Sequence, residues 1–197
     1  MSNDDYIDLR LGEFLERLSA DGSAPGSGSA AALSIAFSAS LVGMVARCSR
    51  DLWNESGGVA AQAEAIRDRA VVLAQDDGRV WEEALSALHD ARGESADARR
   101  DFRLEQKLED AAAVPLEIAE LGADAAALAA LAGERGDGTY RADASAAAAL
   151  AAGGARAAAH LVQVNLAVRP GDTRLVRARA SEQAASEAAD RLLTPIR

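Results

Sequence analysis

The sequence predicts an all-α fold, a single-domain helical bundle over residues 1–197 that is built around a buried central helix. Alanine, the residue with the highest helix propensity, makes up about a quarter of the chain. Aromatic residues account for only 4% of it, although strands favour aromatic and β-branched side chains. Hydrophobic residues recur with the spacing of helix faces, and the length suits one domain with a substantial core better than two.

The first two predicted helices flank a segment of turn-forming residues. Residues 9–20 place apolar side chains on one face and charged side chains on the other, which is typical of a short amphipathic helix. Residues 21–28 combine glycines with a proline and end this helix. Ser29 then suits the N-cap of a helix over 30–50, because its hydroxyl can accept from a backbone N–H of the first turn. Residues 30–46 carry no charge, so we expect this helix to be the central and most buried one.

Two long helices follow. The first spans 59–90 and has an apolar seam at steps of four and three residues, which Asp77 interrupts. Residues 91–98 contain a glycine and several polar residues, which indicates a turn. The second long helix spans 98–132. Pro115 within it predicts a kink or a break just before it, because proline removes a backbone hydrogen bond.

Two further helices complete the predicted bundle. A polar, glycine-rich loop over 133–142 precedes Asp143, which we expect to N-cap a helix over 144–168. The proline and glycine at 170–171 end that helix, and Asp172 caps a last helix close to the C-terminus.

Charge and cysteine content restrict the classes of function. A net charge of −10 argues against nucleic-acid binding and against an anionic membrane surface. The uncharged run at 30–46 reaches only the short limit for a membrane-spanning helix, and residues 1–11 lack the apolar core of a signal peptide. Cys48 is the single cysteine and has no partner for an internal disulfide, and no Cys/His cluster indicates a metal site. These observations predict a cytoplasmic protein that binds no metal.

Asp77 is the first candidate for chemistry. Burying a carboxylate is unfavourable unless it is satisfied, so its place on an apolar seam needs a reason. One reason is function, because a buried carboxylate can act as a general acid or base or stabilise a cation. The other is structural, if Asp77 meets water or a buried arginine.

A second candidate is the segment at the start of the predicted central helix, which comprises Pro25, Gly26, Ser27, Gly28 and Ser29. Its glycines allow the backbone to approach a ligand, and a helix start offers backbone N–H groups to a polar ligand. The same residues can also form an ordinary turn between helices. Because the lysine of a P-loop is missing, the segment does not indicate nucleotide binding.

Four further polar residues have both functional and structural interpretations. Asp137 lies between two glycines and can shape a turn, and Asp143 suits an N-cap. Asn165 borders the apolar seam of its helix, where an asparagine can bind a ligand or satisfy a neighbouring backbone group. His160 lies near the same seam.

Several of these elements occur together, and in the same order, in one family. Over nearly its whole length the sequence resembles the cyclodeaminase/methenyltetrahydrofolate cyclohydrolase family, which also forms the C-terminal half of formiminotransferase-cyclodeaminase. The resemblance is carried by LGEFL at 11–15, PGSGSAAA at 25–32, LVGMV at 41–45, Asp77 followed by Trp81, AVPL at 113–116, Asp143 and Asn165.

The chain also departs from the family pattern around the expected pocket. Ser27 replaces the middle glycine, Asp137 stands where the family has asparagine, and Leu161 replaces the first of two asparagines spaced by four. Arg50 lies in a region where the family carries lysines. These differences leave the expected fold unchanged. Because they surround the expected pocket, they concern which substrate the protein binds.

The resemblance implies a bundle of the cyclodeaminase type and an enzyme that acts on an amidine-type C–N bond of a folate. Such enzymes add water to 5,10-methenyltetrahydrofolate or close the same ring with loss of ammonia. It implies a homodimer without a covalently bound cofactor, with Asp77 as the catalytic residue. It further implies that a tetrahydrofolate derivative is bound by Pro25, Gly26, Ser27, Gly28, Ser29, Asp137, Asp143, His160 and Asn165.

Two alternatives remain open at this point. The first alternative to a folate enzyme is a divergent relative that makes or breaks a C–N bond in a non-folate small molecule. The second is a non-catalytic helical protein that binds a small molecule or a partner. Turnover of methenyltetrahydrofolate separates the folate enzyme from both alternatives.

Overall fold

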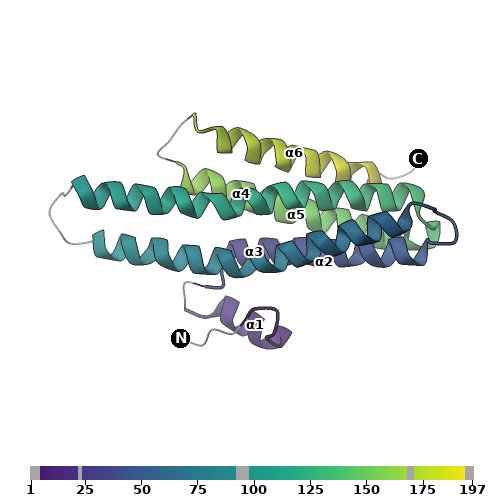
Figure 1. The fold of residues 1–197 in the computed structure, drawn as a ribbon, viewed down its shortest axis with the longest axis horizontal. Coiled ribbons are helices and arrows are strands. Elements are labelled where there is room, and N and C mark those ends of the chain that lie inside the picture. The colour runs from purple at the N-terminus through teal and green to yellow at the C-terminus, as the bar shows by residue number, and fades with distance from the viewer. Residues whose placement is uncertain (1–4, 22–23, 92–97, 168–170, 194–197) are drawn as a thin grey trace.

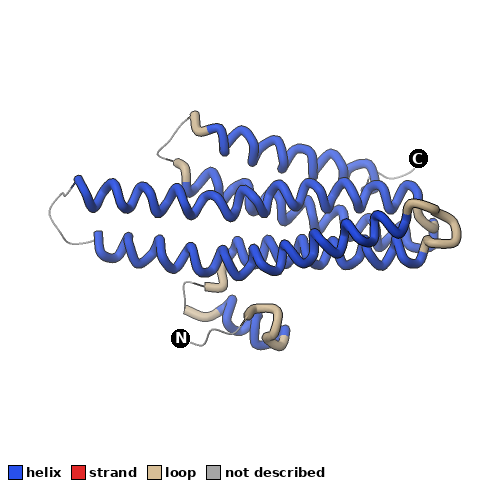
Figure 2. The backbone as a smooth tube through the Cα atoms, in the orientation of Figure 1, coloured by secondary structure: helices blue, strands red, loops and turns tan. Residues whose placement is uncertain are grey.

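A computed structural model describes residues 5–21, 24–91, 98–167 and 171–193. Over these ranges the chain forms α-helices, one short 3₁₀ helix and no strand (Figures 1 and 2), so the all-α prediction is confirmed. The elements are α1 (Leu11–Ser19), α2 (Ser27–Cys48), α3 (Ser56–Ala91), α4 (Ala98–Arg135), η1 (Gly138–Tyr140), α5 (Arg141–Asn165) and α6 (Thr173–Leu193).

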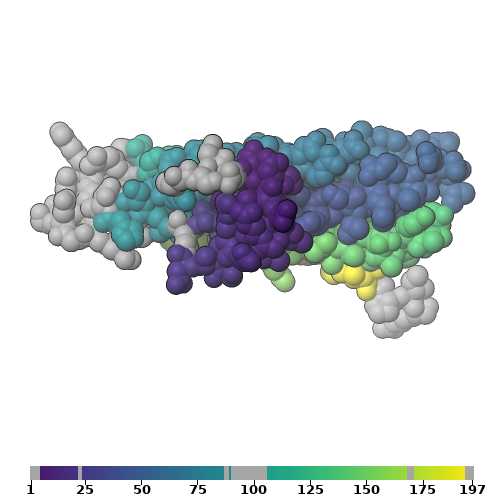
Figure 3. Space-filling view, turned by 90° about the horizontal axis from the view of Figure 1, so that it is seen from below, coloured from purple at the N-terminus to yellow at the C-terminus, as the bar shows by residue number. Residues whose placement is uncertain are grey.

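Five of the helices that the structure describes form the bundle, and the short α1 lies outside it. Helices α2 to α6 run along the long axis of the molecule, whereas the short α1 lies against one long face (Figures 1 and 3). Helix α2 packs against α3, α4 and α5, and α4 also packs against α3, α5 and α6. Helices α2, α4 and α5 therefore form the middle of the bundle, and α3 and α6 cover its sides.

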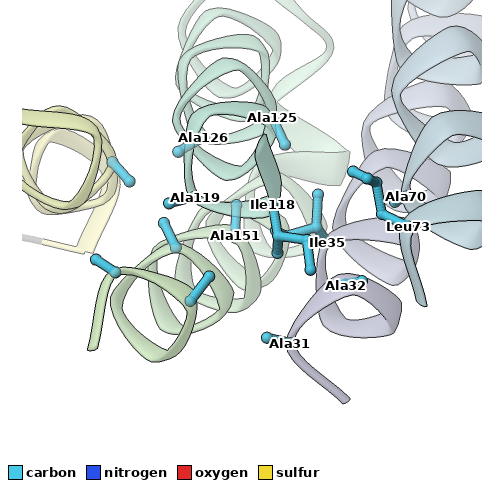
Figure 4. Packing of buried hydrophobic residues seen from close by; sticks show 14 of the residues in the cluster. Ala31, Ala32, Ile35, Ala70, Leu73, Ile118, Ala119, Ala125, Ala126 and Ala151 are labelled. Carbon is cyan, nitrogen blue, oxygen red and sulfur yellow. The ribbon is translucent and has the colours of Figure 1, made fainter. Parts of the chain in front are cut away.

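Small residues let the central helices approach closely. Ile35 of α2 and Ile118 of α4 are fully buried and lie close together in the core, with Ala151 of α5 beside them (Figure 4). A Cβ at Gly154 of α5 would lie 2.8 Å from Ile35 Cγ1 and 2.9 Å from the carbonyl oxygen of Ala31. Because interaxial distance depends on the side chains at the contact, these residues fix α5 close to α2.

Helix α2 is a core helix, but it is not buried on every face. By length and composition it could cross a membrane, with a mean hydropathy of 1.8, yet 61% of its most apolar stretch is buried inside the bundle. Ile35, Val42 and Val45 are fully buried, whereas Phe37 is 54% exposed. The expectation that this helix is central and buried is therefore confirmed for the sides that face the bundle, whereas the face with Phe37 is exposed. That face lines an apolar groove that the N-terminal segment covers only in part.

Three helices begin three residues earlier than the sequence predicts, namely α2, α5 and α3, which begins at Ser56 instead of residue 59. Helix α2 begins at Ser27 with Gly26 as its N-cap, so Ser29 lies in the first turn, where its hydroxyl donates to the Ala74 carbonyl at 2.8 Å. Helix α5 begins two residues before Asp143, which lies in its first turn. The N-cap roles predicted for Ser29 and Asp143 are therefore wrong. An acidic residue in the first turn still interacts favourably with the helix dipole.

The remaining boundaries agree in part with the prediction. Helix α4 runs through Pro115, so the alternative of a break there is wrong. The Asp172 carboxylate accepts from the N–H of Arg174 at 2.9 Å, which confirms its capping role. Helix α5 ends at Asn165, and most of the turn predicted at 91–98, like residues 168–170, lies outside the described residues.

Candidate active site

A cleft of about 150 Å³ lies where the start of α2 meets α3, α4 and α5. The residues that line it from α2 and α3 are Gly26, Ser27, Gly28, Asp77, Val80 and Trp81. Those from α4 and α5 are Ala111, Pro115, Leu161, Val164 and Asn165. Among these described lining residues, Asp77 alone carries a charge, so the cleft suits a cationic or hydrogen-donating ligand.

The Asp77 carboxylate lies directly against Gly28, in the first turn of α2. A Cβ at position 28 would occupy the place of the carboxylate, so only glycine fits there. The backbone N–H of Ser29 donates a hydrogen bond to the same carboxylate. The first turn of a helix has N–H groups without helical partners and carries partial positive charge. The sequence analysis expected the Ser29 hydroxyl to accept a hydrogen bond from a backbone N–H of the first turn. In the structure the Asp77 carboxylate of α3 is the acceptor for such an N–H.

Burial controls the protonation of Asp77. It raises the pKa of this carboxyl to about 6, and the hydrogen bond from the Ser29 N–H opposes the increase. A carboxyl group with a pKa near 6 is populated in both protonation states close to neutral pH. Asp77 can therefore accept a proton in one step and return it in another, as a general acid–base catalyst requires.

The other residues of the glycine-containing segment have distinct roles. Pro25 is buried and lies outside the cleft, immediately before Gly26. The Ser29 hydroxyl ties α2 to the Ala74 carbonyl, one turn before Asp77 on α3. Ser27 is exposed and lines the cleft, so a side chain is tolerated at this position. The departure from glycine at 27 is thus compatible with the fold, whereas position 28 has no room for a side chain.

Asn165 reaches the cleft from the last turn of α5. Its Nδ2 donates to the Ala111 carbonyl of α4 at 2.8 Å. The amide nitrogen is therefore occupied, and the structure shows no hydrogen bond to Oδ1 from any described residue. Asn165 and Asp77 thus contribute polar side chains to the cleft from different helices.

The remaining predicted site residues do not line this cleft. The Asp137 N–H donates to Ser49 Oγ at 2.8 Å, next to the C-terminal end of α2, whereas the cleft lies at the N-terminal end. Asp143 lies in the first turn of α5, whereas the cleft is lined by its last turn. His160 is exposed on α5, one residue from Leu161, and does not line the cleft. Asp137 also accepts from the Thr139 N–H, and this bond lowers its pKa.

Apart from Leu161, which the sequence analysis placed around the expected pocket, the apolar residues that line the cleft were not predicted to belong to the site. Val80 and Trp81 follow Asp77 by three and four residues, and Leu161 and Val164 precede Asn165 by four and one. Residues three or four apart share a helix face, so this spacing could have identified most of them. Within the described ranges, no group of three or more His, Cys, Asp or Glu side chains is arranged to hold a metal ion.

Comparisons with known proteins agree with this architecture. The family model described as formiminotransferase-cyclodeaminase matches residues 10–185. A crystal structure of formiminotetrahydrofolate cyclodeaminase from Thermotoga maritima is similar in fold, with a TM-score of 0.83, 22% sequence identity and 94% of each chain covered. No curated protein matches the sequence. The match over most of the chain shows that this protein belongs to the formiminotransferase-cyclodeaminase family.

Proposed function

We propose that this protein is an enzyme of folate one-carbon chemistry that acts on the amidine-type carbon between two folate nitrogens. It adds water to 5,10-methenyltetrahydrofolate, as a cyclohydrolase, or performs the related cyclodeaminase reaction, in which the ring closes with loss of ammonia. Family membership supports the reaction class. The observation that carries the proposal is Asp77, the charged group of the cleft, whose pKa of about 6 suits proton transfer in either reaction.

The two reactions use Asp77 in opposite protonation states. In hydrolysis, a water oxygen bonds to the cationic methenyl carbon while the Asp77 carboxylate accepts a proton from this water. The acid then donates that proton to one folate nitrogen as its bond to the carbon breaks, and the hydroxyl proton leaves as the formyl carbonyl forms. In deamination, a folate nitrogen bonds to the carbon of the protonated formimino group (=NH2+) and loses its own proton to solvent, which leaves a neutral NH2 group on that carbon. Protonated Asp77 then donates a proton to this NH2 group, which departs as ammonia as its bond to the carbon breaks.

The size of the cleft indicates which part of the substrate it holds. Its volume of about 150 Å³ is below the several hundred Å³ of pockets that enclose drug-sized ligands. We therefore assign the cleft to the reacting carbon and its two nitrogens, with the rest of the folate outside. The glutamate carboxylates would pair with arginines beyond the rim, because the described lining residues include no lysine or arginine.

Turnover by the purified protein tests this proposal. Loss of methenyltetrahydrofolate absorbance reports the hydrolase, and ammonia release from formiminotetrahydrofolate reports the deaminase. We expect Asp77→Asn to reduce turnover on the order of 10²-fold or more. Asp76→Asn is the matched control, because Asp76 faces Arg79 at 3.5 Å, outside the cleft. Absence of turnover with both folates would refute the folate assignment, and full activity of Asp77→Asn would refute the assigned proton carrier.

We further propose that the protein is a cytoplasmic homodimer that binds neither nucleic acid nor membranes. Its net charge of −10 opposes contact with nucleic acids and anionic lipids. The exposed apolar side chains around Phe37 support a surface for a second copy of the chain.

A further inference from the structure

Pro115 leaves one backbone carbonyl of α4 without its usual partner. In an α-helix, the carbonyl of residue 111 accepts from the N–H of residue 115. Proline has no N–H, and its ring also presses against the carbonyl four residues before it. Ala111 is buried, and an unpaired buried carbonyl is unfavourable. The helix nevertheless continues through Pro115, so this carbonyl needs another donor.

Asn165 of α5 is that donor. Its Nδ2 lies 2.8 Å from the Ala111 carbonyl oxygen, a normal hydrogen-bond length. The contact satisfies the group that Pro115 leaves unpaired. It joins α4 to α5 at the cleft, which Ala111, Pro115 and Asn165 all line.

This hydrogen bond also determines which end of the Asn165 amide can meet a ligand. An asparagine side chain has a donor nitrogen and an acceptor oxygen on opposite sides of one carbon. Because Ala111 holds the nitrogen, Oδ1 is directed away from that contact. The cleft then combines two acceptors, Asn165 Oδ1 and the Asp77 carboxylate, which together favour a substrate group with N–H donors or positive charge.

We infer that Pro115 is a positioning residue: it reserves the Ala111 carbonyl for Asn165 and thereby holds Asn165 Oδ1 as a hydrogen-bond acceptor for the reacting nitrogen group of the substrate. This inference rests on the proposed function for the identity of the substrate. The orientation of the Asn165 amide can be measured without any substrate.

The decisive experiment is a double-mutant cycle with Pro115→Ala and Asn165→Ala. Pro115→Ala restores a backbone N–H that competes for the Ala111 carbonyl. We expect its kcat/KM to fall about tenfold, the value of one hydrogen bond. Its Tm should not decrease, because the new helical bond and the better propensity of alanine offset the lost ring contacts. Asn165→Ala should lose at least as much activity, and the double variant should match Asn165→Ala, because Pro115 acts through Asn165.

Gly153→Ala provides a matched control on the same helix as Asn165. Gly153 is exposed, and a Cβ there meets no atom within 4 Å, so the variant adds helix propensity without touching the cleft. We expect it to retain full activity. A Pro115→Ala variant with unchanged kcat/KM, or losses that multiply in the double variant, would overturn the positioning role.

A second readout separates this inference from the proposed function. The Asn165 side-chain amide protons should be protected from solvent exchange by NMR in the wild-type protein, and their protection should decrease in Pro115→Ala. Unchanged protection would overturn the inference even if the enzyme were active. Inactivity of the wild type on both folates would overturn the proposed function, and the exchange measurement would still decide the role of Pro115.

Discussion

The protonation of Asp77 links its proposed role in proton transfer to the stability of the fold. Its pKa of about 6 means that the folded chain holds this proton more tightly than the unfolded chain, where an aspartate titrates near pH 4. Between these values the folded state binds more protons than the unfolded state. The free energy of unfolding therefore falls as pH rises through this window, by up to about 3 kcal/mol in total.

Asp77→Asn should remove this pH dependence. We expect the variant to be more stable than the wild type at about pH 8, where burial of the charged carboxylate destabilises the folded state, and to lose this advantage at about pH 4. Urea unfolding at both pH values measures the difference. Asp76→Asn should not reproduce this pattern, because Asp76 lies outside the cleft and beside Arg79. An Asp77→Asn variant that is less stable than wild type at both pH values would contradict the prediction.

The pH dependence of turnover should distinguish the two proposed reactions. Hydrolysis requires the Asp77 carboxylate as a base, so kcat/KM should rise as pH increases through about 6. Deamination requires protonated Asp77, so kcat/KM should fall over the same interval. The rates are measured from about pH 5 to pH 8, with the uncatalysed reaction subtracted at each value. A flat profile with either substrate would exclude proton transfer by Asp77 as the step that limits kcat/KM.

At the level of secondary structure, the contact between α2 and α3 depends on the absence of a side chain at Gly28. In Gly28→Ala the new methyl group and the Asp77 carboxylate would compete for one position. We expect a loss of stability on the order of 1–3 kcal/mol and a loss of activity comparable to that of Asp77→Asn. Thermal unfolding and turnover measure the two effects.

Gly57→Ala is the control for this substitution. Gly57 is also in the first turn of a helix, α3, and a Cβ there has no neighbour within 4 Å. It should therefore leave both stability and activity close to wild type. Equal effects of the two substitutions would show that the clash with Asp77 is not responsible.

The sequence predicted the helices better than their ends. The α2 helix was expected to begin after Ser29, because serine is a strong local N-cap. It begins at Ser27 instead, since Asp77, distant in sequence, provides the acceptor for the first turn. In the same way, a break in α4 at Pro115 was one of the predicted outcomes. The helix continues instead, and Asn165 donates to the Ala111 carbonyl that Pro115 leaves without a helical partner. Local patterns cannot show such partners, because they come from other helices.

The candidate site was predicted in part for the same reason. Asp77 was identified from its own position on an apolar seam, and the structure brings it to the glycine segment at the start of α2. Asp137 and Asp143 were predicted to belong to the same site. However, Asp137 lies by the C-terminal end of α2 and Asp143 lies in the first turn of α5, whereas the cleft is at the other end of both helices. Helical periodicity shows which residues share a face. It does not show which end of a long helix meets which neighbour.

At the scale of the whole molecule, one surface remains incompletely covered. An apolar groove of about 460 Å³ runs between the N-terminal segment and helices α2 and α3. Phe37 is 54% exposed in this groove, and Leu11 of α1 and Ile7 are 64% and 58% exposed. Neighbouring exposed apolar side chains of this kind mark interaction surfaces. This face therefore suits the contact between the two copies of the proposed homodimer.

Phe37→Glu tests this arrangement. A second copy that covered the groove would have to bury the new carboxylate against a largely apolar surface, so the variant should be monomeric under conditions in which the wild type is a dimer. Because Phe37 is largely exposed in the isolated chain, the substitution should leave the helical content unchanged. Val176→Glu is the matched control, since Val176 is 70% exposed on α6, which lies on the other side of the bundle (Figure 1). Light scattering at micromolar concentration measures the masses. A monomeric wild type would refute the dimer, and a dimeric Phe37→Glu variant would place its interface elsewhere.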